Sequence, residues 1–152
     1  MKVYVASSWR NDRQPGVVNL LREHGHEVYD FRNPAPGDGG FHWRAIDPDW
    51  ESWDAADYRE VLRTHPRAAE GFGKDHDAME WAEVCVLVLP CGRSAHLEAG
   101  EFIGAGKRLV ILLDANPEPE LMYMGASSIC ISAGEVLEVL EGYRRDDETV
   151  EP

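Results

Sequence analysis

Glu98 stands out among the acidic residues because small residues surround it in segment 95–100 (AHLEAG). The pattern predicts a helix over residues 92–107, which places Glu98 in or near the first turn. There the helix dipole favours the ionised form of a carboxyl group. An ionised carboxylate beside a bound sugar can attack the anomeric carbon and form a covalent glycosyl intermediate. A glutamate that only complements the helix dipole fits the same spacing.

A nucleophilic carboxylate needs a second group that protonates or orients the leaving group. Asp75, Asp77 and Glu80 precede an apolar strand and are candidates for this role. Acids that merely begin a helix produce the same pattern. Glu101 follows Glu98 by three residues and shares part of its helical face, but it suits a solvated position.

Two pairs of serine and arginine follow expected strands and could bind a phosphate. Ser8 and Arg10 come after the first strand, and Arg93 and Ser94 come after the third. An arginine binds phosphate through forked, charge-assisted hydrogen bonds, and a helix N-terminus adds further donors. Arginines on an ordinary surface are the alternative interpretation.

Tryptophans, histidines and cysteines complete the candidate groups. Trp9, Trp43, Trp50 and Trp53 could stack on a base, or they could pin a loop to the body of the protein or to a partner subunit. The histidines are scattered and the three cysteines form no CxxC pair, so we expect no metal site. Glycine-rich dinucleotide and phosphate-loop motifs are also lacking, and we expect no cofactor.

Alternating strand and helix patterns position these residues. Apolar runs predict strands at residues 2–6, 26–31, 84–89, 109–113 and 129–132, and helical patterns start near Pro15 and cover residues 54–63, 74–82, 92–107 and 134–145. The order predicts an α/β fold, a doubly wound parallel five-stranded sheet with helices on both faces. Such sheets bind ligands at the carboxyl ends of their strands. Residues 32–53 form a long loop, which is typical of a lid or an interaction surface.

Length and charge limit the functional classes. The 152 residues, 43% of them apolar, suit one domain over residues 1–145 followed by an acidic tail over 146–152. The formal net charge of −13 argues against binding to nucleic acid or to an anionic membrane surface. The acidity is concentrated in residues 46–85 and 114–152, whereas the segments with the serine and arginine pairs are slightly basic. Because no signal-peptide pattern or membrane-spanning apolar run is present, we expect a cytoplasmic protein.

Segments 92–100 (GRSAHLEAG) and 106–111 (GKRLVI) resemble the glutamate-bearing helix and following strand of the nucleoside 2-deoxyribosyltransferase family. That family includes 2-deoxynucleoside 5-monophosphate N-glycosidases and a hydroxymethyl-CMP hydrolase. The resemblance covers roughly residues 1–31 and 72–132, while the insert at about 32–71 has no counterpart in the transferases. It implies a flavodoxin-like fold, homodimers or higher homo-oligomers with shared active sites, and Glu98 as the nucleophile.

The resemblance also assigns roles to single positions. Asp75 matches an active-site aspartate, with Asp77 as the alternative register, and Ser8-Trp9-Arg10 resembles the turn that holds the phosphate in the monophosphate hydrolases. Met122 lies in segment 121–125, which resembles the segment that reaches into a neighbouring subunit's site. Two positions depart from the family. Gly92 replaces an aspartate or serine, a role that Arg93 or Ser94 could take over, and Glu120 replaces an asparagine or serine.

These features predict an enzyme that hydrolyses the N-glycosidic bond of a ribosyl or deoxyribosyl nucleoside 5-monophosphate through a covalent intermediate on Glu98. Base exchange between deoxynucleosides is the alternative among enzymes. A catalytically silent module that binds and senses a nucleotide is the alternative among binding proteins. A protein-interaction domain that uses the tryptophan-rich loop is a third.

Overall fold

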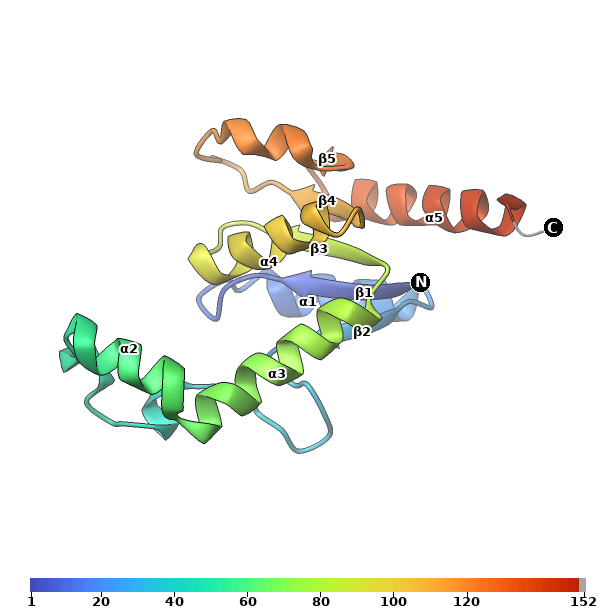
Figure 1. Ribbon diagram of the computed structural model, residues 1–152. Coiled ribbons are helices and arrows are strands. Elements are labelled where there is room, and N and C mark those ends of the chain that lie inside the picture. The colour runs from blue at the N-terminus through green and yellow to red at the C-terminus, as the bar shows by residue number, and fades with distance from the viewer. Residues whose placement is uncertain (151–152) are drawn as a thin grey trace.

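Five parallel strands form the centre of the protein, which a computed structural model describes over residues 1–150. The strands are β1 (Lys2–Ala6), β2 (Glu27–Asp30), β3 (Val84–Val88), β4 (Arg108–Leu112) and β5 (Ser128–Cys130), and their order in the sheet is β2-β1-β3-β4-β5. This order is that of flavodoxin-like doubly wound sheets. It confirms the predicted α/β architecture, which Figure 1 shows with helices on both sides of the sheet.

Side chains that alternate along the strands build a separate apolar layer on each face of the sheet. On one face, Val3 and Val86 pack against helices α1 (Gln14–Glu23) and α5 (Ala133–Val150). On the other face, Tyr4 and Leu87 pack against helices α3 (Pro66–Trp81) and α4 (Arg93–Gly104). Strand β3 is buried along its whole length because it lies inside both layers.

Helix α3 begins eight residues earlier than predicted. His65 caps it, since the Nδ1 atom accepts the backbone N–H of Arg67 at 3.2 Å, and Pro66 occupies its first turn. A proline there loses no helical hydrogen bond, so it favours the start of the helix rather than breaking it. Helix α2 (Ala55–Thr64) precedes it and starts with a capping box built on Asp54.

Helix α5 also extends further than predicted, to Val150, so residues 146–150, which were predicted to belong to an acidic tail, are helical. Arg108 explains part of this difference, because its guanidinium binds both carboxylate oxygens of Asp147 at 2.8 Å. Residues 151 and 152 lie outside the described part of the chain. In the described part, no helix is both long and apolar enough to cross a bilayer.

Residues of the insert form a unit that protrudes from the sheet, with α2 and the first turns of α3 at its end (Figure 1). Two short 3-10 helices, η1 (Trp43–Ala45) and η2 (Trp50–Ser52), lie in its loop. Gly40, at φ +78°, lets this loop approach the backbone oxygen of Phe31 and the ring of Trp9. The loop therefore closes onto the end of the sheet near the candidate phosphate residues.

Candidate active site

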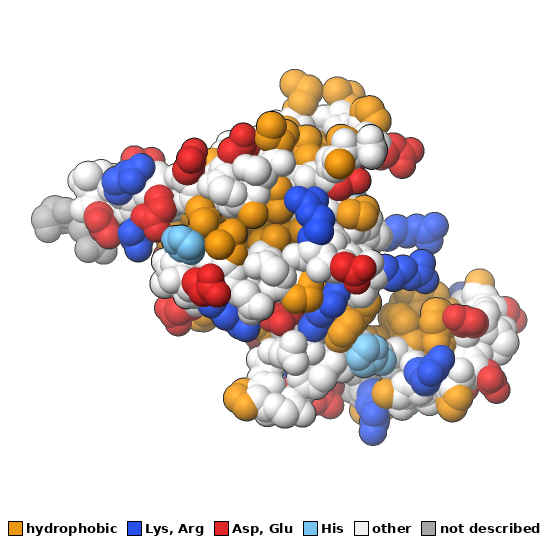
Figure 2. Space-filling view, turned by 180° about the vertical axis from the view of Figure 1, so that it is seen from behind, with side chains coloured by type: hydrophobic (Ala, Val, Ile, Leu, Met, Phe, Trp, Pro, Cys, Tyr) orange, Lys and Arg blue, Asp and Glu red, His pale blue; other side chains and the backbone are white. Residues whose placement is uncertain are grey.

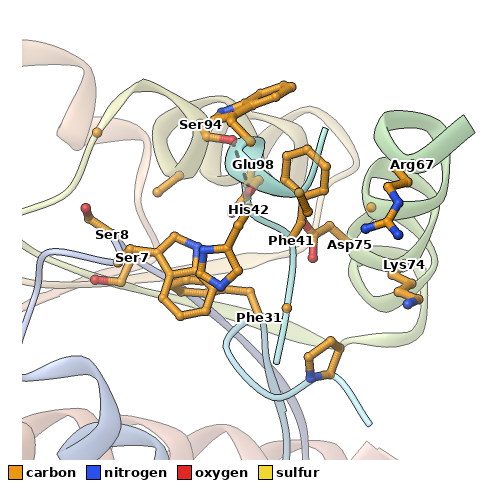
Figure 3. Close-up of a pocket in the computed structure, with 18 of the residues that line it drawn as sticks. Ser7, Ser8, Phe31, Phe41, His42, Arg67, Lys74, Asp75, Ser94 and Glu98 are labelled. Atoms are coloured by element: carbon orange, nitrogen blue, oxygen red, sulfur yellow. Dashed lines mark hydrogen bonds between the residues drawn. The ribbon is translucent and has the colours of Figure 1, made fainter. Parts of the chain in front are cut away.

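A cavity of about 1130 Å³ lies between the carboxyl ends of β1, β2 and β3 and the insert. Glu98 and Asp75, which are far apart in the sequence, both line it. Figure 3 shows Glu98 entering from α4 and Asp75 from α3. The cavity therefore brings together the two carboxylates that the sequence analysis singled out.

Glu98 lies in the second turn of α4, over the buried ring of Tyr4. Burial, together with the negative charge of Asp75, raises the pKa of Glu98 to about 7, while the hydroxyls of Tyr4 and Ser94 lower it. The helix dipole was expected to favour the ionised form of this carboxyl, but removal from water outweighs the dipole beyond the first turn. Glu98 instead exchanges its proton near neutral pH.

Asp75 faces the cavity from the middle of α3, so it is not an acid that begins a helix. The hydroxyl of Tyr29 donates a 2.8 Å hydrogen bond to its Oδ1 atom, and burial raises the pKa of the carboxyl. Asp77 was the alternative candidate, but it is exposed and does not line the cavity. Two residues along a helix turn the side chain by about 200°, so only one of the two aspartates can face inward.

Tyr4 and Tyr29 form a floor under the carboxylates that sequence reasoning missed. They are neighbours in the register of β1 and β2, and their rings stack with centroids 5.3 Å apart. The Tyr4 hydroxyl is buried and makes no hydrogen bond of good geometry within the described residues. In the sequence, an aromatic residue in the middle of a strand indicates ordinary core. Only the position of Tyr4 beside Glu98 in the structure identifies it as a site residue.

The turn after β1 carries Ser8, Trp9 and Arg10, all of which line the cavity. Ser8 Oγ accepts the backbone N–H of Arg10 at 3.2 Å, and the Arg10 guanidinium is exposed. Arg32 fixes the turn from outside, because its guanidinium donates to the carbonyl oxygens of Ser8, Trp9 and Asn11 at 2.9–3.1 Å. The turn is thereby held in one shape.

The start of α4 forms the neighbouring wall. Gly92 is its N-cap residue and contributes no side-chain cap, and the next two residues, Arg93 and Ser94, are exposed and line the cavity. Ser94 Oγ donates to Glu98 Oε1 at 3.4 Å, a contact drawn in Figure 3. Ser94 therefore contacts the candidate nucleophile.

The insert and the adjoining turns of α3 supply the opposite wall, with basic residues that the sequence analysis did not single out. Arg44, Arg67 and Lys74 line the cavity there, and Lys74 pairs with Asp38 at 2.8 Å. A helix that starts at Pro66 would have revealed Arg67 as a site residue. Asp75 follows Arg67 by eight residues, and residues eight apart on one helix share a face.

The tryptophans divide between the two predicted roles. Trp9 stacks with His42 at 4.3 Å between ring centroids and meets Phe31 edge-on at 5.3 Å. Trp43 and Trp50 line the cavity, whereas Trp53 points its Nε1 atom to Asp47 and packs against Trp43 within the insert. Trp53 therefore pins the loop, as does Trp9 through its stack on His42, while Trp9, Trp43 and Trp50 also line the cavity.

Glu120 and Met122 are exposed and do not line the cavity of their own chain. Met122 lies in η3 (Leu121–Gly125), and Glu120 directly precedes it. His96 links η3 to α4, because its Nε2 atom lies 2.8 Å from the Tyr123 hydroxyl. Cys91 adjoins the same histidine, but burial raises the pKa of its thiol to about 12, which disfavours a nucleophilic thiolate.

One group of possible metal ligands occurs among the described residues, on the outer face of α3. Its atoms, from His76, Asp77 and Glu80, lie within 4.8 Å of one another. None of these residues lines the cavity. The carboxylates that face the cavity are thus placed for acid, base or nucleophilic chemistry on an organic ligand.

Comparison with known proteins supports the fold assignment. No protein-family model and no curated protein matches the sequence. Among solved structures, the chain is similar to a 2-deoxyribosyltransferase from Bacillus psychrosaccharolyticus, with a TM-score of 0.62 and 17% identity over 90% of each chain. It is also similar to the CMP N-glycosidase of Clostridium botulinum, with a TM-score of 0.52 and 17% identity over 93% of this chain and 99% of the other. The chain therefore has the fold of these two enzymes.

Proposed function

We propose that the protein hydrolyses the N-glycosidic bond of a nucleoside 5-monophosphate, with Glu98 as nucleophile and Asp75 as the group that assists departure of the base. The observation that carries the proposal is the half-buried Glu98, whose pKa is raised to about 7 by removal from water and by the charge of Asp75, in a cavity that Arg10 and Arg93 also line. Both structural neighbours named above act on N-glycosidic substrates according to their descriptions.

The two carboxyls interact, so between their pKa values the pair holds one proton. In the proposed reaction, the shared proton first moves from Glu98 to Asp75. Asp75 then gives it to the leaving base while the ionised Glu98 attacks C1 of the sugar, which breaks the C1–N bond and forms a glycosyl ester. Water then attacks C1, Asp75 takes a proton from it, and Glu98 is released as a carboxylate. The pair ends with one proton, as it began.

The 5-phosphate would lie between the turn after β1 and the start of α4. Arg10 and Arg93 form no ion pair or side-chain hydrogen bond with the described residues, so their guanidiniums are free for an anion. Ser8 and Ser94 add neutral donors, and backbone N–H groups at the start of α4 add more. Two guanidiniums at one end of the cavity suit a phosphate dianion.

Release of free base by chromatography tests this proposal. The protein is incubated with a panel of ribonucleosides, deoxyribonucleosides and their 5-monophosphates. Glu98→Ala and Glu98→Gln should lower base release at least about 1,000-fold, because loss of a nucleophile removes the covalent route. Glu101→Gln, on the same helix but outside the cavity, is the matched control and should retain activity. Unchanged turnover in Glu98→Ala contradicts the proposal, and saturable binding without base release identifies a sensing module.

Base exchange is the second candidate, favoured by the likeness to a 2-deoxyribosyltransferase. In that reaction a second base, rather than water, attacks the glycosyl ester. Adding an isotope-labelled free base to a deoxynucleoside reaction separates the two. Label in a new nucleoside indicates transfer, whereas accumulation of free sugar or sugar phosphate indicates hydrolysis.

We further propose that two or more copies associate through the surface around η3. Leu121, Met122 and Met124 are 77–81% exposed, and Leu97 on α4 is 76% exposed. Figure 2 shows apolar side chains gathered at this end of the molecule. Such a surface is typical of an interface. Sedimentation should give an oligomer for the wild type and a smaller species for Met122→Glu together with Met124→Glu; identical masses contradict the proposal.

A further inference from the structure

The cavity is larger than a compact ligand requires, and its two ends are both basic. Its volume of about 1130 Å³ exceeds the roughly 300–1,000 Å³ of pockets that hold drug-sized ligands. Arg10 and Arg93 occupy the end at the sheet, and Arg44 and Arg67 occupy the end at the insert. The carboxylates Asp75 and Glu98 enter the same cavity from α3 and α4. The substrate phosphate accounts for only the first basic end.

The basic residues of the insert differ in whether a carboxylate neutralises them. Lys74 is 2.8 Å from Asp38 and 2.9 Å from Glu70, so its charge is fully neutralised and the three side chains together keep one negative charge. Arg44 and Arg67 form no ion pair and no side-chain hydrogen bond with any described residue. An arginine that lines a cavity without a partner retains five N–H donors for a ligand.

Helix α3 sets the direction in which Arg67 acts. Arg67, Gly71, Lys74 and Asp75 follow the i, i+4, i+7, i+8 spacing of one helical face, and all four line the cavity. Arg67 and Asp75 are separated by about 12 Å of helix rise, which a base, its substituent and the long arginine side chain can span together. Figure 3 shows Arg67 and Lys74 beyond Asp75 as seen from Ser8.

Aromatic side chains line the space between Asp75 and the arginines. Phe41 contacts the α3 face at Gly71, where an added Cβ would lie 2.8 Å from its ring, and Phe41 meets Trp43 edge-on at 4.7 Å. Both rings line the cavity. A planar heterocycle stacks well on such rings, and a charged substituent on it would extend toward the arginines.

From this arrangement we infer that the preferred substrate carries a second anionic group on its leaving base, a carboxylate or a phosphate, which Arg67 and Arg44 bind. The inference rests on the proposed function for the orientation of the nucleotide. The phosphate of the sugar would lie at Arg10 and Arg93, and the anionic base at the insert. An uncharged base would leave the exposed guanidiniums of Arg44 and Arg67 to water.

Binding to Glu98→Gln protein tests the inference without turnover. Two matched pairs of probes differ in a carboxylate on the base: nicotinate against nicotinamide mononucleotide, and orotidine against uridine 5-monophosphate. In at least one pair, calorimetry should show that the carboxylated nucleotide binds about tenfold more tightly than its uncharged counterpart, as expected for one charge-assisted hydrogen bond. Arg67→Gln in the same background should abolish the difference, and Arg63→Gln, on exposed α2 outside the cavity, should keep it.

Each remaining outcome overturns the inference. Equal affinities within both pairs, a preference that persists in Arg67→Gln, or failure of all four probes to bind would each do so. The proposed function fails separately, since it requires base release by the wild type whichever base is preferred. A wild type that releases only uncharged bases would retain the proposed function and refute the anionic leaving group.

Discussion

The Tyr29 hydroxyl donates a 2.8 Å hydrogen bond to Asp75 Oδ1, and this bond joins the sheet to the inner face of helix α3. Tyr29 comes from β2 and also stacks on Tyr4, which lies against Glu98. The two candidate carboxylates thus rest on one pair of stacked rings. Asp75 is oriented by a neutral donor that leaves its other oxygen, Oδ2, free for a substrate.

Tyr29→Phe should therefore reduce kcat about tenfold and change KM little, because the bond orients Asp75 rather than binding the ligand. The ring remains, so stacking on Tyr4 is preserved. Tyr143→Phe removes a hydroxyl that contacts Ser128 on the far side of the protein and is the matched control. A rise in KM with unchanged kcat would show that Tyr29 binds substrate instead.

The pH dependence of kcat/KM should reveal the shared proton. Because the active pair holds one proton, kcat/KM of the wild type should fall as pH rises through about 7, the pKa of Glu98. Asp75→Asn removes the charge that raises this pKa and also the proton donor, so Glu98 then only has to be ionised. The residual kcat/KM of the Asp75→Asn variant should rise with pH over the range below pH 7. If kcat/KM of this variant instead still falls as pH rises through 7, the two carboxyls do not share a proton.

Ionised Glu98 should lower the stability of the folded protein. Its pKa is raised from 4.5 to about 7 on folding, so the folded state binds the proton more tightly than the unfolded state. The contribution of Glu98 to the stability of the fold is therefore largest below pH 4.5 and is lost as pH rises through 7. Glu98→Gln should raise the free energy of unfolding by up to about 3 kcal/mol at pH 8 and by much less at pH 5.

Urea unfolding at the two pH values measures this difference. Glu101→Gln serves as the control, since Glu101 is exposed on the same helix. If Glu98→Gln raises the free energy of unfolding equally at pH 5 and pH 8, ionisation of Glu98 does not destabilise the folded protein.

Closure of the insert over the sheet depends on Gly40. Its φ of +78° is strained for other residues, and an added Cβ would lie 2.9 Å from the Trp9 ring and closer still to the Phe31 carbonyl. Gly40→Ala should destabilise the protein by about 2 kcal/mol and impair turnover. Gly39→Ala is the matched neighbour, with open space around its Cβ position. Thermal unfolding and base release of both variants check this, and equal effects would contradict it.

Much of the candidate site was predictable because it follows strand ends. Glu98, Ser8 and Arg10 were placed at one edge of the sheet from local patterns alone, and the structure puts all three around one cavity. Local patterns could not decide whether Asp75 or Asp77 faces the cavity. Their choice depends on the rotation of α3, which is set by its start at Pro66 and by packing of Ala78 and Met79 on the sheet.

The sequence by itself determined the five strands and their parallel, doubly wound arrangement, since periodicity and turn residues act between near neighbours in the chain, but it did not determine where α3 begins or where α5 ends. Only the tertiary structure decided the chemistry of the cavity. The pKa of Glu98 depends on burial over Tyr4 and on the charge of Asp75, and the second basic end depends on the insert folding back so that Arg67 faces the sheet. Both arise from contacts between distant segments, whose distances no local pattern contains.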